Sequence, residues 1–234
     1  QRAFDCIFHD GLLQDLPIIY CMDRAGLVGP DGPTHHGVFD IPMLRMLPNM
    51  VVTAPKDGNE LKNLLATATA SGKSFSIRYP KGSSRNFDSS LTPEILKIGE
   101  WEALNKGCKV AILATGSMVA IVEDYLEFIS KALGFIPTLI NARFIKPLDM
   151  TMLSSLSNNY DAIITMEEGC LAGGFGSAVI EYFNDIGSQI KVSRMGIPDN
   201  FIEHGTRAEL LDSLNLNANG VISKIKAIMG DLNE

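Results

Sequence analysis

The residues that could carry out chemistry gather in one loop, DRAGLVGPDGPTHHGVFD, at positions 23–40. Arg24 offers a planar fork of hydrogen-bond donors that suits a phosphate or a carboxylate. His35 can exchange a proton near neutral pH, and Asp31, four residues earlier in a turning loop, is expected to reach the imidazole and set its tautomer. Lys81 follows a later apolar run and adds a second cation. The two cations together indicate one small anionic substrate.

The backbone of the same loop favours a rigid structure. Its four glycines permit positive φ angles and close backbone approach, and its two prolines fix the turns between them. His36 follows His35 directly, and adjacent side chains diverge, so we do not expect both imidazoles to act on one substrate. A histidine in a loop more often has a structural role, but the density of glycine and charge favours a functional role for His35.

The loop is expected to leave the carboxyl end of a buried strand. Apolar runs alternate with helical patterns through the first 82 residues. The pattern predicts strands at 16–22, 49–55 and 75–80, and helices at 1–14, 41–47 and 57–70. Asp57 and Glu60 are placed as a capping box for the last of these helices. Such alternation implies right-handed crossovers and a parallel sheet, whose strand-to-helix loops gather ligands at one edge.

The α/β pattern resumes after a polar segment at 83–107 that is rich in Ser, Asn and Pro at its start. Within it, IGEWEAL alternates apolar with polar residues and is compatible with an edge strand. The remaining pattern predicts strands at 109–117, 135–143, 161–168 and 190–198, and helices at 118–133, 146–156, 173–187, 206–215 and 218–230. We therefore predict an α/β fold of two three-layer αβα domains with mostly parallel sheets, at residues 1–90 and 91–234.

Composition excludes several classes of function. A formal charge of -7 argues against a nucleic-acid partner or an anionic membrane surface, because such binding needs a basic excess. No apolar run approaches the ~18 residues of a membrane span. The four cysteines stand far apart without metal-site or disulfide spacing, which is typical of a reducing compartment and predicts a cytoplasmic location and no metal site. The helical pattern that begins at Gln1 without a cap leads us to expect a piece of a longer protein.

Several motifs together carry a resemblance. The loop 23–40 is preceded by QRAFD and followed by PNMVV, RYPKG, RFIKPLD and GGFGSAV. In this order the motifs resemble the 1-deoxy-D-xylulose-5-phosphate synthases, thiamine-diphosphate enzymes related to transketolase, and the resemblance covers essentially all 234 residues. It implies the back part of a pyrimidine-binding domain, followed by the family's C-terminal domain. It also implies decarboxylative condensation of pyruvate with glyceraldehyde 3-phosphate, which serves isoprenoid, thiamine and pyridoxal biosynthesis.

The resemblance assigns roles to individual residues. It implies that Arg24 and Lys81 hold the substrate phosphate, that Asp31 and His35 line the reacting carbons, and that Arg2 lies beside the cofactor pocket. Family members often have arginine where Lys81 stands. Lysine keeps the charge but lacks the bidentate fork, so we expect a looser grip on the phosphate from that side chain.

Two signatures of the family are not in this sequence, namely the Gly-Asp-Gly motif with its downstream asparagine and the glutamate that activates the aminopyrimidine. The ligands of the diphosphate and of Mg²⁺ are therefore expected outside this chain, in the missing N-terminal part of the same enzyme. We expect the isolated chain to be inactive and the complete enzyme to be a homodimer. Two alternatives stay open: a β subunit of a 2-oxo-acid dehydrogenase, and a non-catalytic binding or assembly module.

Other candidate sites have weaker support. GGFGSAV follows a predicted strand, but it lacks the third glycine of a dinucleotide-binding motif, so close packing of a helix on a sheet explains its glycines better. Glu167 and Glu168 are neighbours at a strand end and should point to opposite faces, which favours structural roles, one of them toward another domain. His9 lies in a predicted helix and His204 in the loop EHGT, and neither has further support as a site residue.

Overall fold

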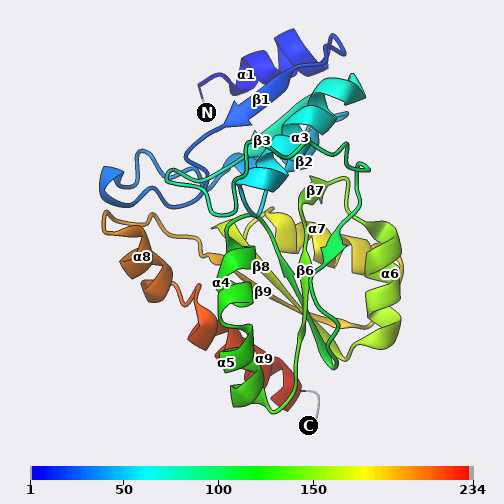
Figure 1. The fold of residues 1–234 in the computed structure, drawn as a ribbon, viewed down its shortest axis with the longest axis vertical. Coiled ribbons are helices and arrows are strands. Elements are labelled where there is room, and N and C mark those ends of the chain that lie inside the picture. Colours follow the sequence, from blue (N-terminus) through cyan, green and yellow to red (C-terminus); the bar gives the residue numbers. More distant parts are fainter. Residues whose placement is uncertain (1, 232–234) are drawn as a thin grey trace.

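The computed structural model describes residues 2–231, which form two sheets flanked by helices (Figure 1). The first sheet has four strands in the order β1-β3-β2-β7, and the second has five in the order β4-β6-β5-β8-β9. The strands are β1 (Ile19–Met22), β2 (Val51–Thr53), β3 (Phe75–Arg78), β4 (Glu102–Ala103), β5 (Val110–Ala114), β6 (Thr138–Asn141), β7 (Phe144–Lys146), β8 (Ala162–Cys170) and β9 (Lys191–Ile197). All pairings are parallel except those of β7 with β2 and β4 with β6. The α/β fold with mostly parallel sheets is thus confirmed.

Helices connect these strands and cover the sheets. The α-helices are α1 (Phe4–Cys6), α2 (Asp40–Arg45), α3 (Gly58–Ser71), α4 (Met118–Asp124), α5 (Leu126–Leu133), α6 (Met150–Asn159), α7 (Phe175–Asp185), α8 (Arg207–Ser213) and α9 (Ala218–Gly230). A π-helical segment, η1 (Ile7–Leu12), continues α1, and a 3₁₀ turn, η2 (Gly29–Asp31), lies inside the loop 23–40. Two predicted helices differ in form: the first is this α1–η1 combination, and the helix at 118–133 is interrupted at Tyr125, which leaves helical geometry.

Side-chain alternation along the second sheet separates its two faces. Ala111, Leu113 and Ile163 belong to one buried cluster together with residues of α6 and α7. The alternate residues of the same strands, Ile112 and Ile164, belong to a second cluster with residues of α4, α5, α8 and α9. Because successive strand residues face opposite ways, this sheet is covered on both sides, and near-continuous apolar strands result.

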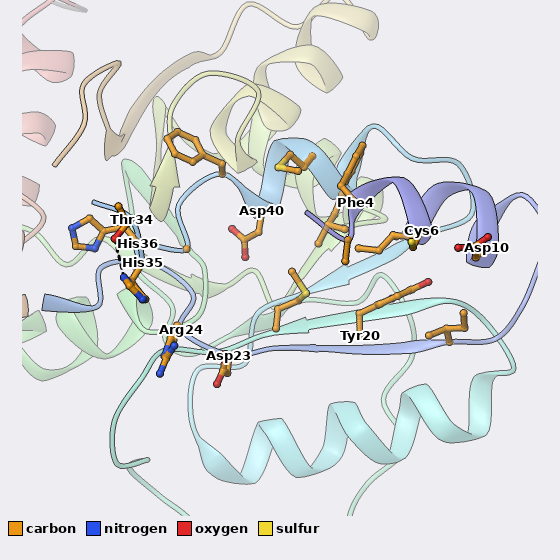
Figure 2. A pocket seen from close by; sticks show the side chains of 18 residues that line it. Phe4, Cys6, Asp10, Tyr20, Asp23, Arg24, Thr34, His35, His36 and Asp40 are labelled. Carbon is orange, nitrogen blue, oxygen red and sulfur yellow. Dashed lines mark hydrogen bonds between the residues drawn. The ribbon is translucent and has the colours of Figure 1, made fainter. Parts of the chain in front are cut away.

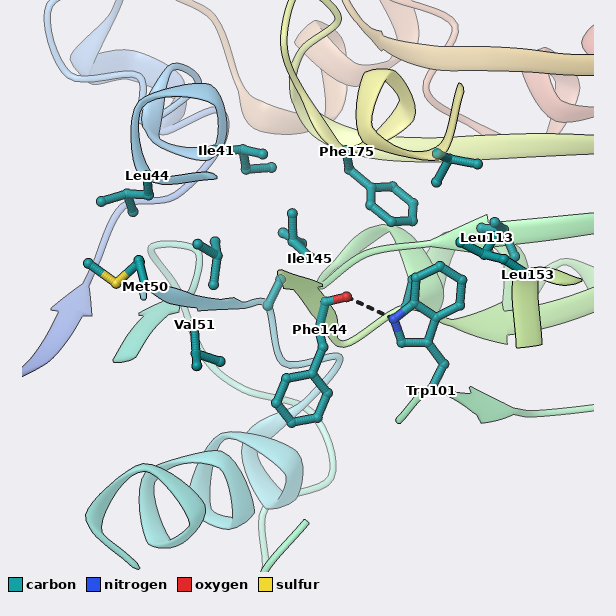
Figure 3. Packing of buried hydrophobic residues seen from close by; sticks show 14 of the residues in the cluster. Ile41, Leu44, Met50, Val51, Trp101, Leu113, Phe144, Ile145, Leu153 and Phe175 are labelled. Carbon is teal, nitrogen blue, oxygen red and sulfur yellow. Dashed lines mark hydrogen bonds between the residues drawn. The ribbon is translucent and has the colours of Figure 1, made fainter. Parts of the chain in front are cut away.

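The first cluster runs on without a break into the first sheet (Figure 3). Trp101 is only 3% exposed, and its indole nitrogen donates to the carbonyl oxygen of Phe144 at 2.8 Å. Phe144 stands on β7, which follows β6 in the chain but pairs with β2. This strand was not predicted as a separate element, and it joins the second half of the chain to the first sheet. The boundary near residue 90 stays a proposal.

The segment after Gly82 packs along α3. Polar side chains on that helix accept hydrogen bonds, at 2.8–3.0 Å, from the backbone amides of Asp88, Glu94 and Leu96. The capping-box prediction is half wrong: Asp57 caps the amide of Glu60 at 2.9 Å, but the Glu60 carboxylate accepts from the amide of Lys56 instead of that of Asp57. Its other oxygen accepts from Asn141 of β6 at 2.7 Å, so Glu60 also links the two halves.

Candidate active site

The loop 23–40 leaves the carboxyl end of β1 and closes at its base. The amides of Gly26 and Gly37 each donate to the other residue's carbonyl oxygen, at 2.7 and 2.9 Å. A β-carbon on Gly37 would lie 2.3 Å from the carbonyl oxygen of Arg24, which no side chain tolerates. Arg24 itself has a φ of 58°, a rare conformation for a residue with a side chain, and such strain is found at functional sites. The loop is therefore held in one conformation by its backbone.

Arg24 and His35 line the same cavity, which has a volume of about 630 Å³ (Figure 2). They lie at one end of it, and Phe4, Cys6 and Tyr20 lie at the other. The imidazole of His35 is exposed, and its Nδ1 atom lies 2.9 Å from the hydroxyl of Thr34. The Nε2 atom has no protein partner within residues 2–231, so it is available to a bound molecule.

Asp31 contacts Lys81 and not His35. Its Oδ2 atom accepts from the Lys81 ammonium at 2.7 Å, and both side chains are partly exposed. The expectation that Asp31 fixes the tautomer of His35 is therefore wrong, because η2 turns the carboxylate toward the end of β3. The hydrogen bond from Lys81 lowers the pKa of Asp31, and the charges of Lys81, His35 and Arg24 act in the same direction. The charges of the other three predicted site residues thus reach Asp31, but Asp31 and Lys81 do not line the cavity of Arg24 and His35.

His36 has a different role from its neighbour. It is 6% exposed, its Nδ1 atom accepts from the amide of Val28 at 3.1 Å, and its Nε2 atom lies 3.4 Å from the carbonyl oxygen of Glu203. An Nδ1 acceptor requires the proton on Nε2, which then donates to that carbonyl. The imidazole therefore ties the loop to the second half of the chain, and the divergence of the two histidines is as expected.

Glu168 fastens the loop to the end of β8. Its Oε1 atom accepts from the amide of Leu27 at 2.9 Å and from Nε of Arg207 at 3.0 Å, and its Oε2 atom accepts from the hydroxyl of Ser117 at 2.7 Å. Gly26 has a positive φ, and a β-carbon there would approach this carboxylate to 2.5 Å. Glu168 is 2% exposed. The carboxylate therefore has a structural role toward the other domain, as the sequence suggested, although its partners were not identified.

A buried arginine at the end of β3 binds the same loop. Arg78, 4% exposed at the end of β3, pairs with Asp40 at 2.8 Å. Its guanidinium also donates to the carbonyl oxygens of Gly37 and Glu168, at 3.3 and 3.0 Å. Burial lowers the pKa of Arg78, but the charge and hydrogen bond of Asp40 outweigh it and the net shift is upward. The sequence signal for this network was an arginine inside an apolar strand, since buried charges need partners.

Glu167 lies on the opposite face of β8 and is fully buried. It accepts hydrogen bonds from the amides of Phe175 and Gly176 at the start of α7, at 2.7 and 2.8 Å. Burial raises the pKa of this carboxyl to about 7, although these hydrogen bonds and the charges of Arg78 and Arg194 act against the shift. A β-carbon on Gly174 would lie 2.3 Å from its carboxylate, so close packing accounts for this glycine.

The other candidates have ordinary surroundings. His9 contacts Asp5 at 2.9 Å on the exposed side of α1–η1. A side chain on Gly32 would touch His204, which follows Glu203 in the loop against which η2 packs. Arg2 is exposed and does not line the cavity, although its neighbours Ala3 and Phe4 do. Within residues 2–231 no three His, Cys, Asp or Glu side chains form a metal-binding group, and no helix has the length and apolar character to cross a membrane.

Family models match both parts of this chain. The pyrimidine-binding domain of transketolase matches residues 1–86, and the transketolase C-terminal domain matches residues 99–221. Among solved structures, a chain described as a split-gene transketolase, inactive beta4 tetramer, matches 98% of this chain and 72% of its own length, with a TM-score of 0.84 and 25% identity.

Curated relatives extend the match along the whole sequence. The 1-deoxy-D-xylulose-5-phosphate synthase of Aquifex aeolicus is 46% identical over 97% of this chain, and that of Dehalococcoides mccartyi (strain ATCC BAA-2266 / KCTC 15142 / 195) is 39% identical over 100%. The synthase of Syntrophus aciditrophicus is 44% identical over 98%. The chain spans only 36%, 36% and 35% of these three proteins, respectively. The resemblance inferred from the motifs is confirmed: this chain belongs to the transketolase-like family that includes these synthases, and it corresponds to the pyrimidine-binding and C-terminal domains.

Proposed function

We propose that the complete protein is a thiamine-diphosphate-dependent 1-deoxy-D-xylulose-5-phosphate synthase, which condenses pyruvate with glyceraldehyde 3-phosphate and releases carbon dioxide. Its product would serve isoprenoid, thiamine and pyridoxal biosynthesis in the cytoplasm, and the active enzyme would be a homodimer. The observation that carries the proposal is the convergence of Arg24, Asp31, His35 and Lys81 at one edge of the first sheet. The Asp31 carboxylate binds the Lys81 ammonium and is within reach of the charges of Arg24 and His35, which supports a phosphate site between the two cations, beside an imidazole with a free ring nitrogen.

The cavity of Arg24 and His35 has walls that fit part of the cofactor. Much of its lining is apolar or aromatic, including Phe4, Tyr20 and Met22, which suits the flat pyrimidine ring of thiamine diphosphate. The bound cofactor supplies the electron sink for decarboxylation. We assign the ligands of its diphosphate and of Mg²⁺ to the part of the protein outside this chain, and Arg2 to the rim of the ring pocket.

The chain's own residues would position the aldehyde and move a proton. The Arg24 guanidinium and the Lys81 ammonium would hold the phosphate, while the Nε2 atom of His35 would exchange a proton with the oxygen of the reacting carbonyl. Asp31 would act next to them by holding the Lys81 ammonium in place through their 2.7 Å contact.

The test is an assay of the complete protein with thiamine diphosphate, Mg²⁺, pyruvate and glyceraldehyde 3-phosphate. We expect release of carbon dioxide that depends on the aldehyde, together with formation of the five-carbon sugar phosphate. Transfer of the acyl group to a lipoyl acceptor without need for the aldehyde would refute the proposal. The isolated 234-residue chain should show no turnover, because it lacks the proposed diphosphate site.

A further inference from the structure

A second cavity, of about 360 Å³, lies between the two halves of the chain. One wall is the segment after β3, with Tyr79 and Lys81, and the opposite wall is formed by Ser117 at the start of α4 and Arg207 at the start of α8. Lys81, one of the two proposed phosphate-binding cations, thus lines this cavity together with residues of the C-terminal domain.

The lining is cationic although the chain as a whole is acidic. It contains the four cations Lys56, Lys81, Arg85 and Arg207, but only the two carboxylates Asp57 and Asp124. Each of the four cations has an ion-pair partner. A cation is open to a ligand only where its partner leaves the cavity side of the charged group uncovered. Arg85 pairs with Glu123 and Asp124, whose side chains are 43% and 54% exposed. Exposed carboxylates at the surface therefore neutralise its charge.

Arg207 is arranged differently, because its counter-ion lies behind it. Its side chain is 34% exposed, whereas that of Glu168 is 3% exposed and does not line the cavity. The Nε and Nη2 atoms donate to Glu168, and Nη2 also donates to Ser117 at 3.0 Å. Among the described residues Nη1 has no partner. Three hydrogen bonds thus fix the guanidinium in the cavity wall and leave one donor group free.

The start of α8 also packs against the turn that carries Asp31. A β-carbon on Gly29, the first residue of η2, would lie 3.2 Å from the carbonyl oxygen of Gly205 and 3.4 Å from the amide of Arg207. Asp31, the last residue of η2, binds the Lys81 ammonium at 2.7 Å. The same contact region therefore places Arg207 and Lys81 along one cavity.

We propose that Arg207 is a further phosphate-binding residue, through which the C-terminal domain contacts the phosphate of the acceptor aldehyde together with Lys81. This inference rests on the proposed function and deepens it. Arginine supplies planar donors that the Lys81 ammonium lacks, and a guanidinium already held by Glu168 and Ser117 loses little freedom when it binds. Arg207 would thus set the preference for a phosphorylated over an unphosphorylated aldehyde.

The test compares two aldehydes in the complete protein. Arg207→Gln should raise the KM for glyceraldehyde 3-phosphate about 10-fold, as expected for a lost charge-assisted hydrogen bond, and leave the KM for pyruvate and for D-glyceraldehyde unchanged. Arg85→Gln is the matched control from the same cavity and should leave all three constants unchanged. A merely structural role would raise the three constants together in Arg207→Gln, and that result would overturn the proposal.

Arg207→Lys separates support of the loop from binding of phosphate. It keeps a cation beside Glu168, so the KM for pyruvate should stay at the wild-type value while the KM for glyceraldehyde 3-phosphate rises. Inorganic phosphate should inhibit the wild-type protein competitively against that aldehyde and more weakly in Arg207→Gln. Noncompetitive inhibition would mean that the cavity holds a separate phosphorylated ligand, and it too would overturn the proposal.

Failure of the proposed function gives a different result. A complete protein that forms no sugar phosphate from pyruvate and the aldehyde would refute the synthase assignment. Thermal stabilisation by inorganic phosphate at constant ionic strength would still support Arg207 as an anion ligand if the stabilisation disappeared in Arg207→Gln and persisted in Arg85→Gln. Equal stabilisation of both variants would refute the role of Arg207 alone.

Discussion

The loop 23–40 has an exposed face and a buried face, and the two differ in chemistry. The exposed face carries Arg24, Asp31 and His35, whose charged or titratable groups reach solvent or the cavity. On the buried face, Leu27 and His36 bind the second half of the chain, as does the carbonyl oxygen of Val38, which accepts from the amide of Cys170 at 2.9 Å. The loop can present reactive groups because its backbone is held by another domain, and loops positioned on a rigid scaffold commonly carry function.

The adjacent histidines show how far this difference goes. His35 lies on the exposed face with Nε2 free of described partners, whereas both ring nitrogens of His36 are engaged with Val28 and Glu203. A change on the buried face should therefore reduce stability, and a change on the exposed face should reduce activity at unchanged stability. The following experiments test whether stability and activity depend on different faces of the loop.

The largest effect is expected from Asp40→Asn. The variant keeps the shape of the side chain but leaves the Arg78 guanidinium, 4% exposed, without its carboxylate. Loss of one partner from a buried ion pair should lower the free energy of unfolding by about 4 kcal/mol. Urea denaturation of the complete protein measures it. Glu100→Gln, which removes half of the exposed pair with Lys97, is the control and should have little effect.

The next effect concerns Glu167, which is buried on β8 and binds the first amides of α7. Its pKa is raised from 4.5 to about 7 by burial, so between these pH values the folded protein keeps a proton that the unfolded chain has lost. The free energy of unfolding should therefore fall as pH rises across this interval. At about 1.36 kcal/mol per pH unit, the fall contributed by this group is about 3 kcal/mol.

Glu167→Gln carries the test of that pH dependence. Glutamine cannot ionise, so the stability of the wild type relative to the variant should decline between pH 4.5 and pH 7, as measured by denaturation at several pH values. A constant difference across this range would show that Glu167 is ionised throughout, stabilised by the charges of Arg78 and Arg194.

His35→Ala should have an effect of similar size on activity and none on stability. Removal of a positioned proton-transfer group lowers turnover by ~10²-fold or more, or about 2.7 kcal/mol of transition-state stabilisation. His36→Ala should instead lower the melting temperature, since it leaves the Val28 amide without its acceptor. Turnover numbers and thermal denaturation of both variants measure the two effects separately. Equal losses of activity at unchanged stability would erase the distinction between the two faces.

Much of the fold could be predicted from sequence because its signals are local. Apolar runs alternating with helical patterns indicated a mostly parallel α/β protein, and the strands of both sheets fall inside the predicted ranges, apart from β7 and the end of β8. Strand β7 was missed because its three residues, Phe144–Lys146, acquire their pairing from β2, about 90 positions earlier in the sequence. The break at Tyr125 likewise has no glycine or proline to announce it.

The candidate site could be predicted only in part for the same reason. Loop composition and family motifs singled out Arg24, Asp31 and His35, but neither tells which partner a carboxylate selects. Glu168 contacts Leu27 of the other domain, 141 residues away in the sequence, and Arg207 of its own domain, 39 residues away. No short-range pattern encodes such a contact, although a buried glutamate at a strand end was a signal that a partner was needed.

A small effect on stability is expected from Asp31→Asn, on the exposed face. The carboxylate and the Lys81 ammonium are both partly in water, and exposed ion pairs contribute little to folding because solvent screens them. The melting temperature should therefore change by no more than about 2 °C. The hydrogen bond from Lys81 lowers the pKa of Asp31, so what stability the pair adds is present at neutral pH and is lost as pH falls through the lowered pKa.

Activity should respond to Asp31→Asn more than stability does, because the amide no longer holds the Lys81 ammonium in a fixed position. We expect the KM for glyceraldehyde 3-phosphate to rise several-fold, because one charge-assisted contact to the phosphate is weakened. The KM for pyruvate should stay unchanged. Lys81→Ala is the matched variant, and the double variant should be no worse than Lys81→Ala if the carboxylate acts only through the ammonium. Additive losses would mean that Asp31 contacts the substrate itself, which its partly exposed side chain permits.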